Sequence, residues 1–181
     1  IHTLTLNGAW VRNNLNIDVN GQNCSTTLNG LYVLDGKQHV DNHTVVDHKV
    51  PHCESFETYK GIVDGKSTAV FNGKVFVRPD AQKTNAYQQN ANIVLSETGS
   101  VNSKPELEIY ADDVKCSHGS TTGQFDEEAL FYLQARGISK AKAQNLLVYA
   151  FAADVLEQLT IPSLEQYITS LLQARFNWEQ V

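Results

Sequence analysis

The feature that most constrains the fold is a recurring turn signal with no helical pattern between its copies. The tripeptide Leu-Asn-Gly begins at Leu6 and again at Leu28, and the related Phe-Asn-Gly begins at Phe71. The intervals of 22 and 43 residues are close to one and two units of about 22 residues. A repeat with a period in the twenties is typical of solenoid proteins. Units built from strands and turns alone predict a β-helix, in which each coil stacks on the last.

Residues 1–121 have the composition of strands and tight turns. Short alternating or apolar runs such as "LNIDV", "TVVDH" and "LEIYA" are separated by Asn-Gly and Asp-Gly dipeptides. These residues adopt positive φ at low cost, so the dipeptides indicate turns between strands. The same pattern leaves open a Greek-key sandwich whose turns are spaced by chance.

The pattern becomes helical from Gln124 onward. The segment "DEEALFYLQARG" has acidic residues in its first turn and Gly137 as a C-terminal stop. Ser139 is placed to cap the next helix, "KAKAQNLLVYAFAADVLEQL", and a third helix opens at "PSLEQ". We therefore predict a mainly β chain, with an N-terminally incomplete β-helix core over 1–121 and a three-helix region over 122–181.

Composition and charge exclude several classes of protein. The 181 residues are 41% hydrophobic, which is enough to form a core without disulfides. A formal net charge of −6 and the lack of any Lys/Arg cluster argue against a nucleic-acid partner. The longest apolar run, Leu146 to Ala153, is too short to cross a membrane. Three cysteines form no disulfide framework, so we expect a reducing compartment and a cytoplasmic location.

A histidine-rich stretch is the first candidate for a metal site. The segment "HVDNHTVVDHKVPHCES" holds His39, His43, His48 and His52, with Cys53 alongside. Such a cluster allows a metal site of the kind found in cupin-like barrels. However, members of each same-face pair lie four residues apart, about 13 Å along a strand that rises roughly 3.3 Å per residue. Polar ladders and turn contacts on a β surface are therefore favoured over a metal site.

Enzymatic motifs are missing from the sequence. It contains no GxSxG, no glycine-rich phosphate loop and no HExxH. A carbohydrate-active β-solenoid enzyme needs clustered carboxylates. Asp112 and Asp113 are adjacent, so in one strand they point to opposite faces. The two side chains are therefore a poor acid–base pair, and the sequence offers no candidate catalytic residues, which disfavours a carbohydrate-active enzyme.

Cys116 and His118 are the second candidate site, in the run "KCSHGST". Residues two apart in a strand face the same way, so the thiol and the imidazole share a side. Together they could hold a soft metal or a sulfur species. The alternative is a packed thiol next to a hydrogen-bonded histidine.

Long runs of the chain resemble the SufD family, one of the two related β-helix families of the SufBCD iron–sulfur cluster assembly scaffold. These runs are "HVDNHTVVDHKVPHCESFETYKGIV", "FNGKVFVRPDAQKTNAYQQNANIVLS" and "KPELEIYADDVKCSHGST", and "FYLQARGIS" is similar to the family's helical motif. The resemblance covers nearly the whole chain and is densest from Leu28 to Gly137. The family is longer, which fits our expectation that a chain without methionine lacks its N-terminal part.

The resemblance implies a right-handed parallel β-helix in a non-enzymatic scaffold subunit. The β-helix would pair with a SufB-like subunit, or with a second SufD copy in a homodimer. The C-terminal helices would dock the SufC ATPase around Phe131, Tyr132, Arg136 and Gly137. A metal-binding cupin-like protein or a β-solenoid carbohydrate-active enzyme remains the alternative.

The resemblance also gives the Cys116 and His118 pair a role. The position matching His118 is the family's candidate cluster ligand at the SufB–SufD interface, and Cys116 lies beside it in the family's run "KCSHGAT". This chain has Ser120 where alanine is usual. No cofactor or metal would be bound stably, and an iron–sulfur cluster would form only transiently at that interface.

Overall fold

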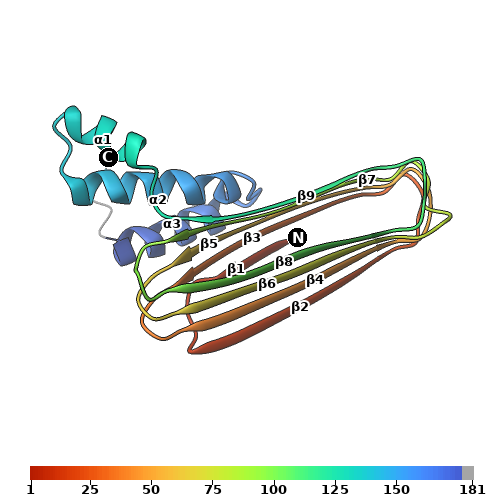
Figure 1. The fold of residues 1–181 in the computed structure, drawn as a ribbon, viewed down its shortest axis with the longest axis horizontal. Helices are drawn as coiled ribbons and strands as arrows, with labels where there is room; N and C mark the ends of the chain where they lie inside the picture. Colours follow the sequence, from red (N-terminus) through yellow and green to blue (C-terminus); the bar gives the residue numbers. More distant parts are fainter. Residues whose placement is uncertain (177–181) are drawn as a thin grey trace. The chain divides into compact units, whose positions relative to one another are not determined.

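A computed structural model describes residues 1–176, and the last part of the predicted helical region, 177–181, lies outside the described residues. The chain divides into two compact units, Ile1–Thr122 and Gly123 onward. The first unit consists of β-strands and the second of helices, as the predicted change of pattern near residue 124 requires (Figure 1).

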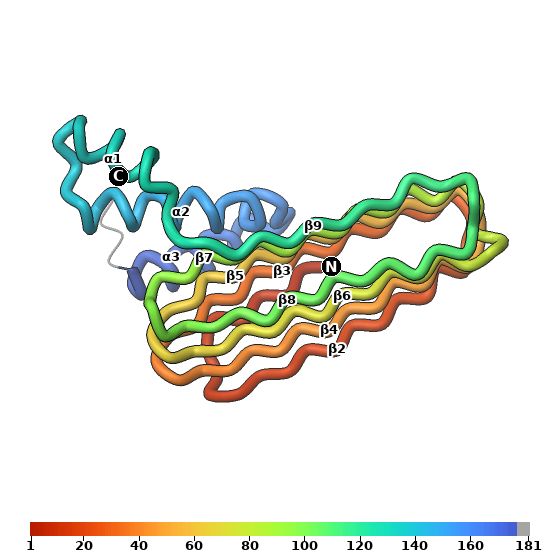
Figure 2. The backbone as a smooth tube through the Cα atoms, in the orientation of Figure 1, coloured from red at the N-terminus to blue at the C-terminus, as the bar shows by residue number. Residues whose placement is uncertain are grey.

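The first unit is a stack of nine strands that alternate between two sheets. One sheet has the order β1-β3-β5-β7-β9 and the other β2-β4-β6-β8. All neighbouring pairs from β1 to β8 are parallel, so two strands and two corners make one coil (Figure 2). The predicted parallel β-helix is confirmed, and the strands form about four coils. A Greek-key sandwich, which needs antiparallel strands, is excluded. The strands are β1 (His2–Thr5), β2 (Trp10–Val19), β3 (Ser25–Leu34), β4 (His39–His48), β5 (Glu54–Val63), β6 (Thr68–Val77), β7 (Asn85–Val94), β8 (Ser100–Ile109) and β9 (Lys115–Gly123).

The coil is longer than the predicted unit of about 22 residues, so that period is wrong. Ser25 pairs with Glu54, 29 positions further on, and Thr68 pairs with Ser100, 32 positions further on. The physical reason is that the three tripeptides do not mark equivalent places. Asn-Gly at 7–8 lies in the corner between β1 and β2, whereas the pairs at 29–30 and 72–73 lie inside β3 and β6, on different sheets.

The repeat with the correct spacing is the tripeptide Asp-Gly-Lys. It occurs at 35–37 and at 64–66, which are equivalent corners of adjacent coils. Gly36 and Gly65 both have positive φ, 56° and 64°, a conformation that glycine adopts without strain. The Gly36 carbonyl accepts a hydrogen bond from the Lys66 N–H at 2.6 Å, so one corner stacks directly on the next.

The interior of the solenoid is filled by the inward-facing side chains of both sheets. Two tyrosines and two glycines interlock there between adjacent coils. Gly30 pairs with Tyr59 and Tyr32 pairs with Gly61, so each ring lies over the glycine of the neighbouring strand. Other core members include Leu28, Leu34, Val40, Val46, Val63, Phe71, Val75 and Val77.

A carboxyl group is buried among these apolar side chains. Glu57 is 1% exposed, and its Oε2 accepts a hydrogen bond from Gln88 Nε2 at 2.6 Å. Burial raises the pKa of Glu57, because the charged form loses its hydration, while the hydrogen bonds it accepts act in the opposite direction. The interior of the solenoid therefore contains a hydrogen-bonded polar pair, Glu57 and Gln88, among its apolar side chains.

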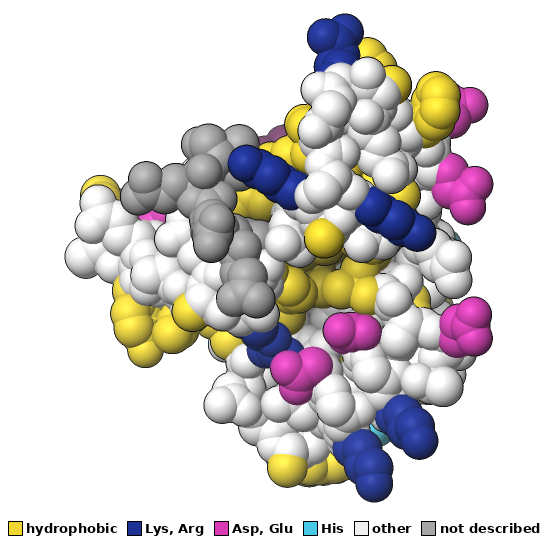
Figure 3. Space-filling model, turned by 90° about the vertical axis from the view of Figure 1, so that its left-hand side faces the viewer, with side chains coloured by type: hydrophobic (Ala, Val, Ile, Leu, Met, Phe, Trp, Pro, Cys, Tyr) yellow, Lys and Arg dark blue, Asp and Glu magenta, His cyan; other side chains and the backbone are white. Residues whose placement is uncertain are grey.

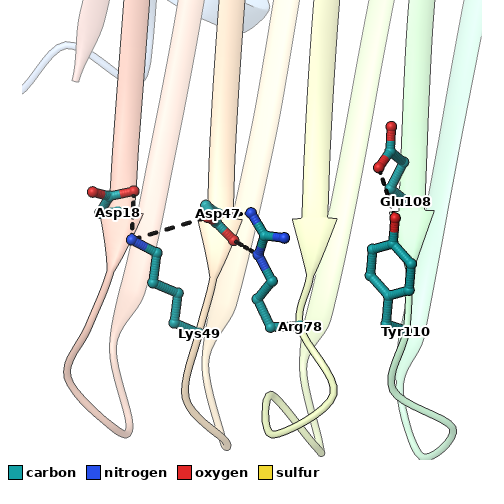
Figure 4. A network of polar contacts seen from close by, with 6 residues as sticks. All are labelled: Asp18, Asp47, Lys49, Arg78, Glu108 and Tyr110. Carbon is teal, nitrogen blue, oxygen red and sulfur yellow. Dashed lines mark hydrogen bonds and ion pairs between the residues drawn. The ribbon is translucent and has the colours of Figure 1, made fainter.

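The outward face of the four-stranded sheet carries rows of paired charges. Arg78 donates to both oxygens of Asp47, at 2.8 and 2.9 Å, and Lys49 bridges to Asp18 at 3.0 Å (Figure 4). Further along this face, the Tyr110 hydroxyl donates to Glu108 at 3.0 Å. The Lys49–Asp18 pair is exposed, and such pairs stabilise a protein by less than about 1 kcal/mol. Asp47 is buried and accepts two hydrogen bonds from Arg78, so this pair ties β4 to the end of β6 more firmly.

The second unit contains three helices, α1 (Glu127–Ala135), α2 (Lys140–Leu156) and α3 (Pro162–Phe176). Gly137 ends α1 with φ of 85°, and the Ile138 N–H returns to the Leu133 carbonyl, so the predicted stop is confirmed. Ser139 caps α2 as predicted, through a 3.4 Å bond from the Lys142 N–H. Among the described residues, no helix is both long enough and apolar enough to cross a bilayer.

The interlocked tyrosines and glycines lead to a stability prediction. We expect Gly61→Ala to lower the free energy of unfolding by about 1–3 kcal/mol, because the new methyl would clash with the Tyr32 ring and the Asn92 amide. Gly119→Ala is the matched control, since nothing lies within 4 Å of its Cβ position and its effect should stay within about 0.5 kcal/mol. Urea unfolding of both variants measures the difference, and equal stabilities would contradict this account.

Candidate functional site

Cys116 and His118 lie on β9, the edge strand of the five-stranded sheet. Because they are two residues apart in a continuous strand, both side chains project to the same side, as predicted. Cys116 is half-buried and packs against the core, whereas His118 is exposed. Gly119 follows them and has open space around it. The pair therefore combines a thiol anchored in the core with an accessible imidazole.

The corner before β9 sets this orientation. Residues 110–114 connect β8 to β9, and Asp112 and Asp113 lie in the bend between the two strands. Asp113 forms an ion pair with Lys83, and its carbonyl accepts a hydrogen bond from the Lys83 N–H at 2.7 Å. The two carboxylates are thus part of a corner that is tied to the coil beneath it.

The register of β9 continues the stacking of the preceding coils. The Lys115 N–H donates to the Thr84 carbonyl, just as the Asn85 N–H donates to the Cys53 carbonyl one coil earlier. Continued along the strands, this register places His118 beside Gln88, whose amide bonds the buried Glu57. Within residues 1–176, Gln88 Oε1 has no protein hydrogen-bond partner. An acceptor that can orient the imidazole therefore lies next to His118.

A hydrogen-bond chain ties β9 to the other sheet through the interior. Ser120 donates to Ser103 Oγ at 2.8 Å, and Ser103 donates to Asn90 Oδ1 at 2.7 Å. Asn90 in turn donates to the Tyr32 hydroxyl at 2.8 Å. Ser120 thus links β9 to β8, the edge strand of the four-stranded sheet. Sequence reasoning missed Ser103 and Asn90, because 13 and 17 positions separate the bonded pairs and only the coil length brings them together.

The protonation of Cys116 bears on what the pair can bind. Burial raises the pKa of the Cys116 thiol, and a hydrogen bond with the Ala86 backbone opposes this effect only in part. At neutral pH the group is a thiol, whereas a metal ligand must be a thiolate. Binding an iron ion here would therefore release a proton and would strengthen as the pH rises.

The helical candidates lie on an exposed, aromatic part of the second unit. Phe131 is 73% exposed and Tyr132 is 56% exposed, and α1 has no buried residue. The Arg136 guanidinium stacks over the Tyr132 ring at 4.4 Å. Gly137 follows directly and fixes the end of the helix. Phe, Tyr and Arg are the residues enriched at protein–protein interfaces, particularly in their central parts.

The four histidines of the metal candidate have separate surroundings. The His39 ring stacks on Trp10, His43 bonds Asp41 at 2.8 Å, and His48 is buried against Ser55 at 2.9 Å. His52 lies at a corner with φ of 60°. Across residues 1–176, no group of three or more His, Cys, Asp and Glu side chains could hold a metal ion. His43 makes a polar contact and His52 lies at a turn, as predicted, but His48 is buried in the interior rather than on the β surface, because inward-facing positions of β4 alternate with outward-facing ones.

Basic side chains are dispersed on the face that Figure 3 shows. There the Lys and Arg side chains stand singly or in pairs, with Asp and Glu side chains between them. That view adds no support for a nucleic-acid interface, which uses a continuous basic surface.

Comparisons with known proteins agree on one family. The family model described as "SUF system FeS cluster assembly, SufBD core domain" matches residues 1–151. The iron–sulfur cluster assembly protein SufD of Escherichia coli is 40% identical to this chain, over 96% of the chain and 41% of its own length. A SufBD family protein of Synechocystis is also 40% identical, over 91% and 36%. Bacillus subtilis SufD is 30% identical, over 77% and 32%. The chain thus spans less than half the length of these curated relatives.

The raised pKa of Cys116 gives a pH prediction. We expect the alkylation rate of Cys116 to keep rising at pH values where an unstructured cysteine peptide has reached its plateau, because burial disfavours the reactive thiolate. Mass spectrometry after timed iodoacetamide pulses measures the rate at each pH. A plateau at the same pH as the peptide, or at a lower one, would show that the thiol is not held in its protonated form.

Proposed function

The chain belongs to the SufBD core family of SUF-system iron–sulfur cluster assembly proteins, and we propose that it is part of a scaffold subunit on which such clusters are built. The observation that carries this proposal is the pairing of an exposed His118 with a half-buried Cys116 on an edge strand. Both residue types are ligands for iron and sulfur chemistry. The cluster is cargo of the scaffold and is passed on.

We infer that a SufB-like subunit covers the β9 edge. An edge strand leaves one row of backbone N–H and C=O groups without strand partners, which favours pairing with another chain. His118 is exposed on that strand, so a subunit docked there would bury it next to its own ligands. A second copy of the same subunit is the other partner that such an edge could accept.

In this scheme the site residues have distinct roles. Cys116 loses its proton when iron arrives and supplies a thiolate from the rim of the core. His118 supplies an imidazole nitrogen, and Gln88, beside it in the register, orients the ring. The Ser120–Ser103–Asn90 chain holds β9 against β8, so that the ligands keep their spacing while the cluster forms.

We propose that the helical unit docks the ATPase of the system, the SufC protein. Phe131 and Tyr132 offer a large exposed aromatic area, and Arg136 adds a cation that is already oriented by its contact with Tyr132. Residues of this type, held in place before binding, often dominate interface energies. ATP hydrolysis would then belong to that partner, and the present chain would be non-enzymatic and cytoplasmic.

The ligand role is tested in the full-length protein, assembled with its SufB-like and SufC partners. We expect His118→Ala to lower the amount of iron and sulfide bound to the complex during cluster build-up by at least several-fold, since one ligand is lost. Ser117→Ala is the control, because Ser117 lies on the same strand and points to the opposite side. Wild-type build-up in the His118 variant would rule out its role as a ligand.

The docking role is tested by binding of the same full-length protein to SufC. We expect Phe131→Ala and Arg136→Ala each to weaken the affinity by roughly tenfold or more, the loss typical of interface hot spots. Lys142→Ala, an exposed change on α2, should leave the affinity unchanged. Isothermal titration calorimetry measures each affinity. If all three variants bind like the wild type, the ATPase docks elsewhere.

A further inference from the structure

Cys24 and Cys53 occupy the same corner of adjacent coils. Cys24 directly precedes β3 and Cys53 directly precedes β5. The first aligned pair of these strands is Ser25 with Glu54, and the Glu54 N–H donates to the Cys24 carbonyl at 2.8 Å. The two cysteines are therefore one position back in a continuous register, 29 residues apart in sequence and neighbours in the stack.

The two sulfur atoms approach the same peptide group. The Cys53 thiol donates to the Gly21 carbonyl at 3.2 Å, and Cys24 Sγ lies 3.2 Å from the place that a Cβ on Gly21 would occupy. Both side chains pack against the interior core of the solenoid. Both sulfurs therefore lie close to Gly21, a residue without a side chain to stand between them, and the Cys53 thiol also lies 3.4 Å from the Pro51 carbonyl.

The backbone spacing suits a disulfide. Neighbouring strands lie about 4.7–4.9 Å apart, and cysteines joined by a disulfide have Cα atoms about 4.4–6.8 Å apart. Cys116 is not a competitor, since its register places it beside Ala86, in a row two positions further along the strands. All three cysteines are free thiols in this structure.

The exposure of the two thiols differs in a way that sets an order of reaction. Cys24 is half-buried, whereas Cys53 is 0% exposed. A dissolved oxidant therefore reaches Cys24 first, and Cys53 is placed to resolve the product. This division between an accessible thiol and a resolving thiol is typical of redox-active cysteine pairs.

We propose that Cys24 and Cys53 form a redox-active dithiol that closes to an intrachain disulfide when the protein meets a low-molecular-weight disulfide such as oxidised glutathione. The Cys24 thiolate attacks one sulfur of the oxidant, which forms a mixed disulfide and releases one glutathione thiolate. The Cys53 thiolate then attacks the Cys24 sulfur and releases the second glutathione. Two electrons pass from the protein to the oxidant, and the two cysteine protons are released to solvent or to the glutathione thiolates.

The disulfide would link two successive coils of the solenoid. It closes a loop of about one coil, and cross-links of this size constrain the unfolded chain. The two stacked corners, residues 20–24 and 49–53, would then be unable to separate by local unfolding. Reduction by a thiol would release it without any change in the register of the strands.

The test is oxidation of the folded, full-length protein. Cys116 and any cysteine outside residues 1–181 are replaced by serine, so that Cys24 and Cys53 are the two thiols left. Excess oxidised glutathione should remove both thiols, lower the mass by about 2 Da without a glutathione adduct, and join the peptides that contain residues 24 and 53. The melting temperature should rise by roughly 5–15 °C. Dithiothreitol should restore both thiols.

Single-cysteine controls make the outcome decisive. Adding Cys53→Ser should leave a stable glutathione adduct on Cys24, and adding Cys24→Ser should leave Cys53 unmodified because it is buried. Two free thiols after oxidation, a lasting adduct on Cys24 with Cys53 intact, or a disulfide between two protein molecules would each overturn the proposal.

Discussion

Stacking of parallel strands at a constant register is the interaction on which the rest of this structure depends. From β3 to β7 every strand has its backbone paired with the coil before and the coil after. Because the register is kept, each inward side chain always meets the same neighbours, and a slip of one residue would turn the whole core outward. The packing of Tyr32 on Gly61 and of Tyr59 on Gly30 is possible only in this register, since each ring needs a glycine directly beside it.

The same register builds the candidate site and explains its mixed character. β9 has a strand on one side only, so its residues are fixed by one neighbour and open on the other side. Cys116 still belongs to the packed interior, while His118, two positions on, reaches solvent. The series of hydrogen bonds from Ser120 to Tyr32 connects this edge strand to the buried core. Within residues 1–176, β9 is held by the core on one side and has backbone groups without a strand partner on the other. Such a strand suits a subunit that binds a cluster where it contacts a partner.

Local patterns in the sequence were enough to predict the strands and helices but not the number of residues in one coil. Gly137 and Ser139 act through bonds to residues three to five positions away, so the helix ends were predictable. The shared side of Cys116 and His118 followed from strand alternation. The period was wrong because Asn-Gly at 29–30 and 72–73 looks like a turn but lies within strands. The contacts of Ser103 and Asn90 could not be predicted either, because the true coil length decides which residues lie opposite Ser120.

The corners, unlike the strands, vary in length. From β2 to β8 every strand has 10 residues, yet the corner at 78–84 is longer than its counterparts at 20–24, 49–53 and 110–114. The stack therefore tolerates added chain at this place without any change in pairing. A short peptide tag or a fluorophore-bearing loop grafted between β6 and β7 would leave both sheets intact, and could serve as a reporter of assembly in living cells.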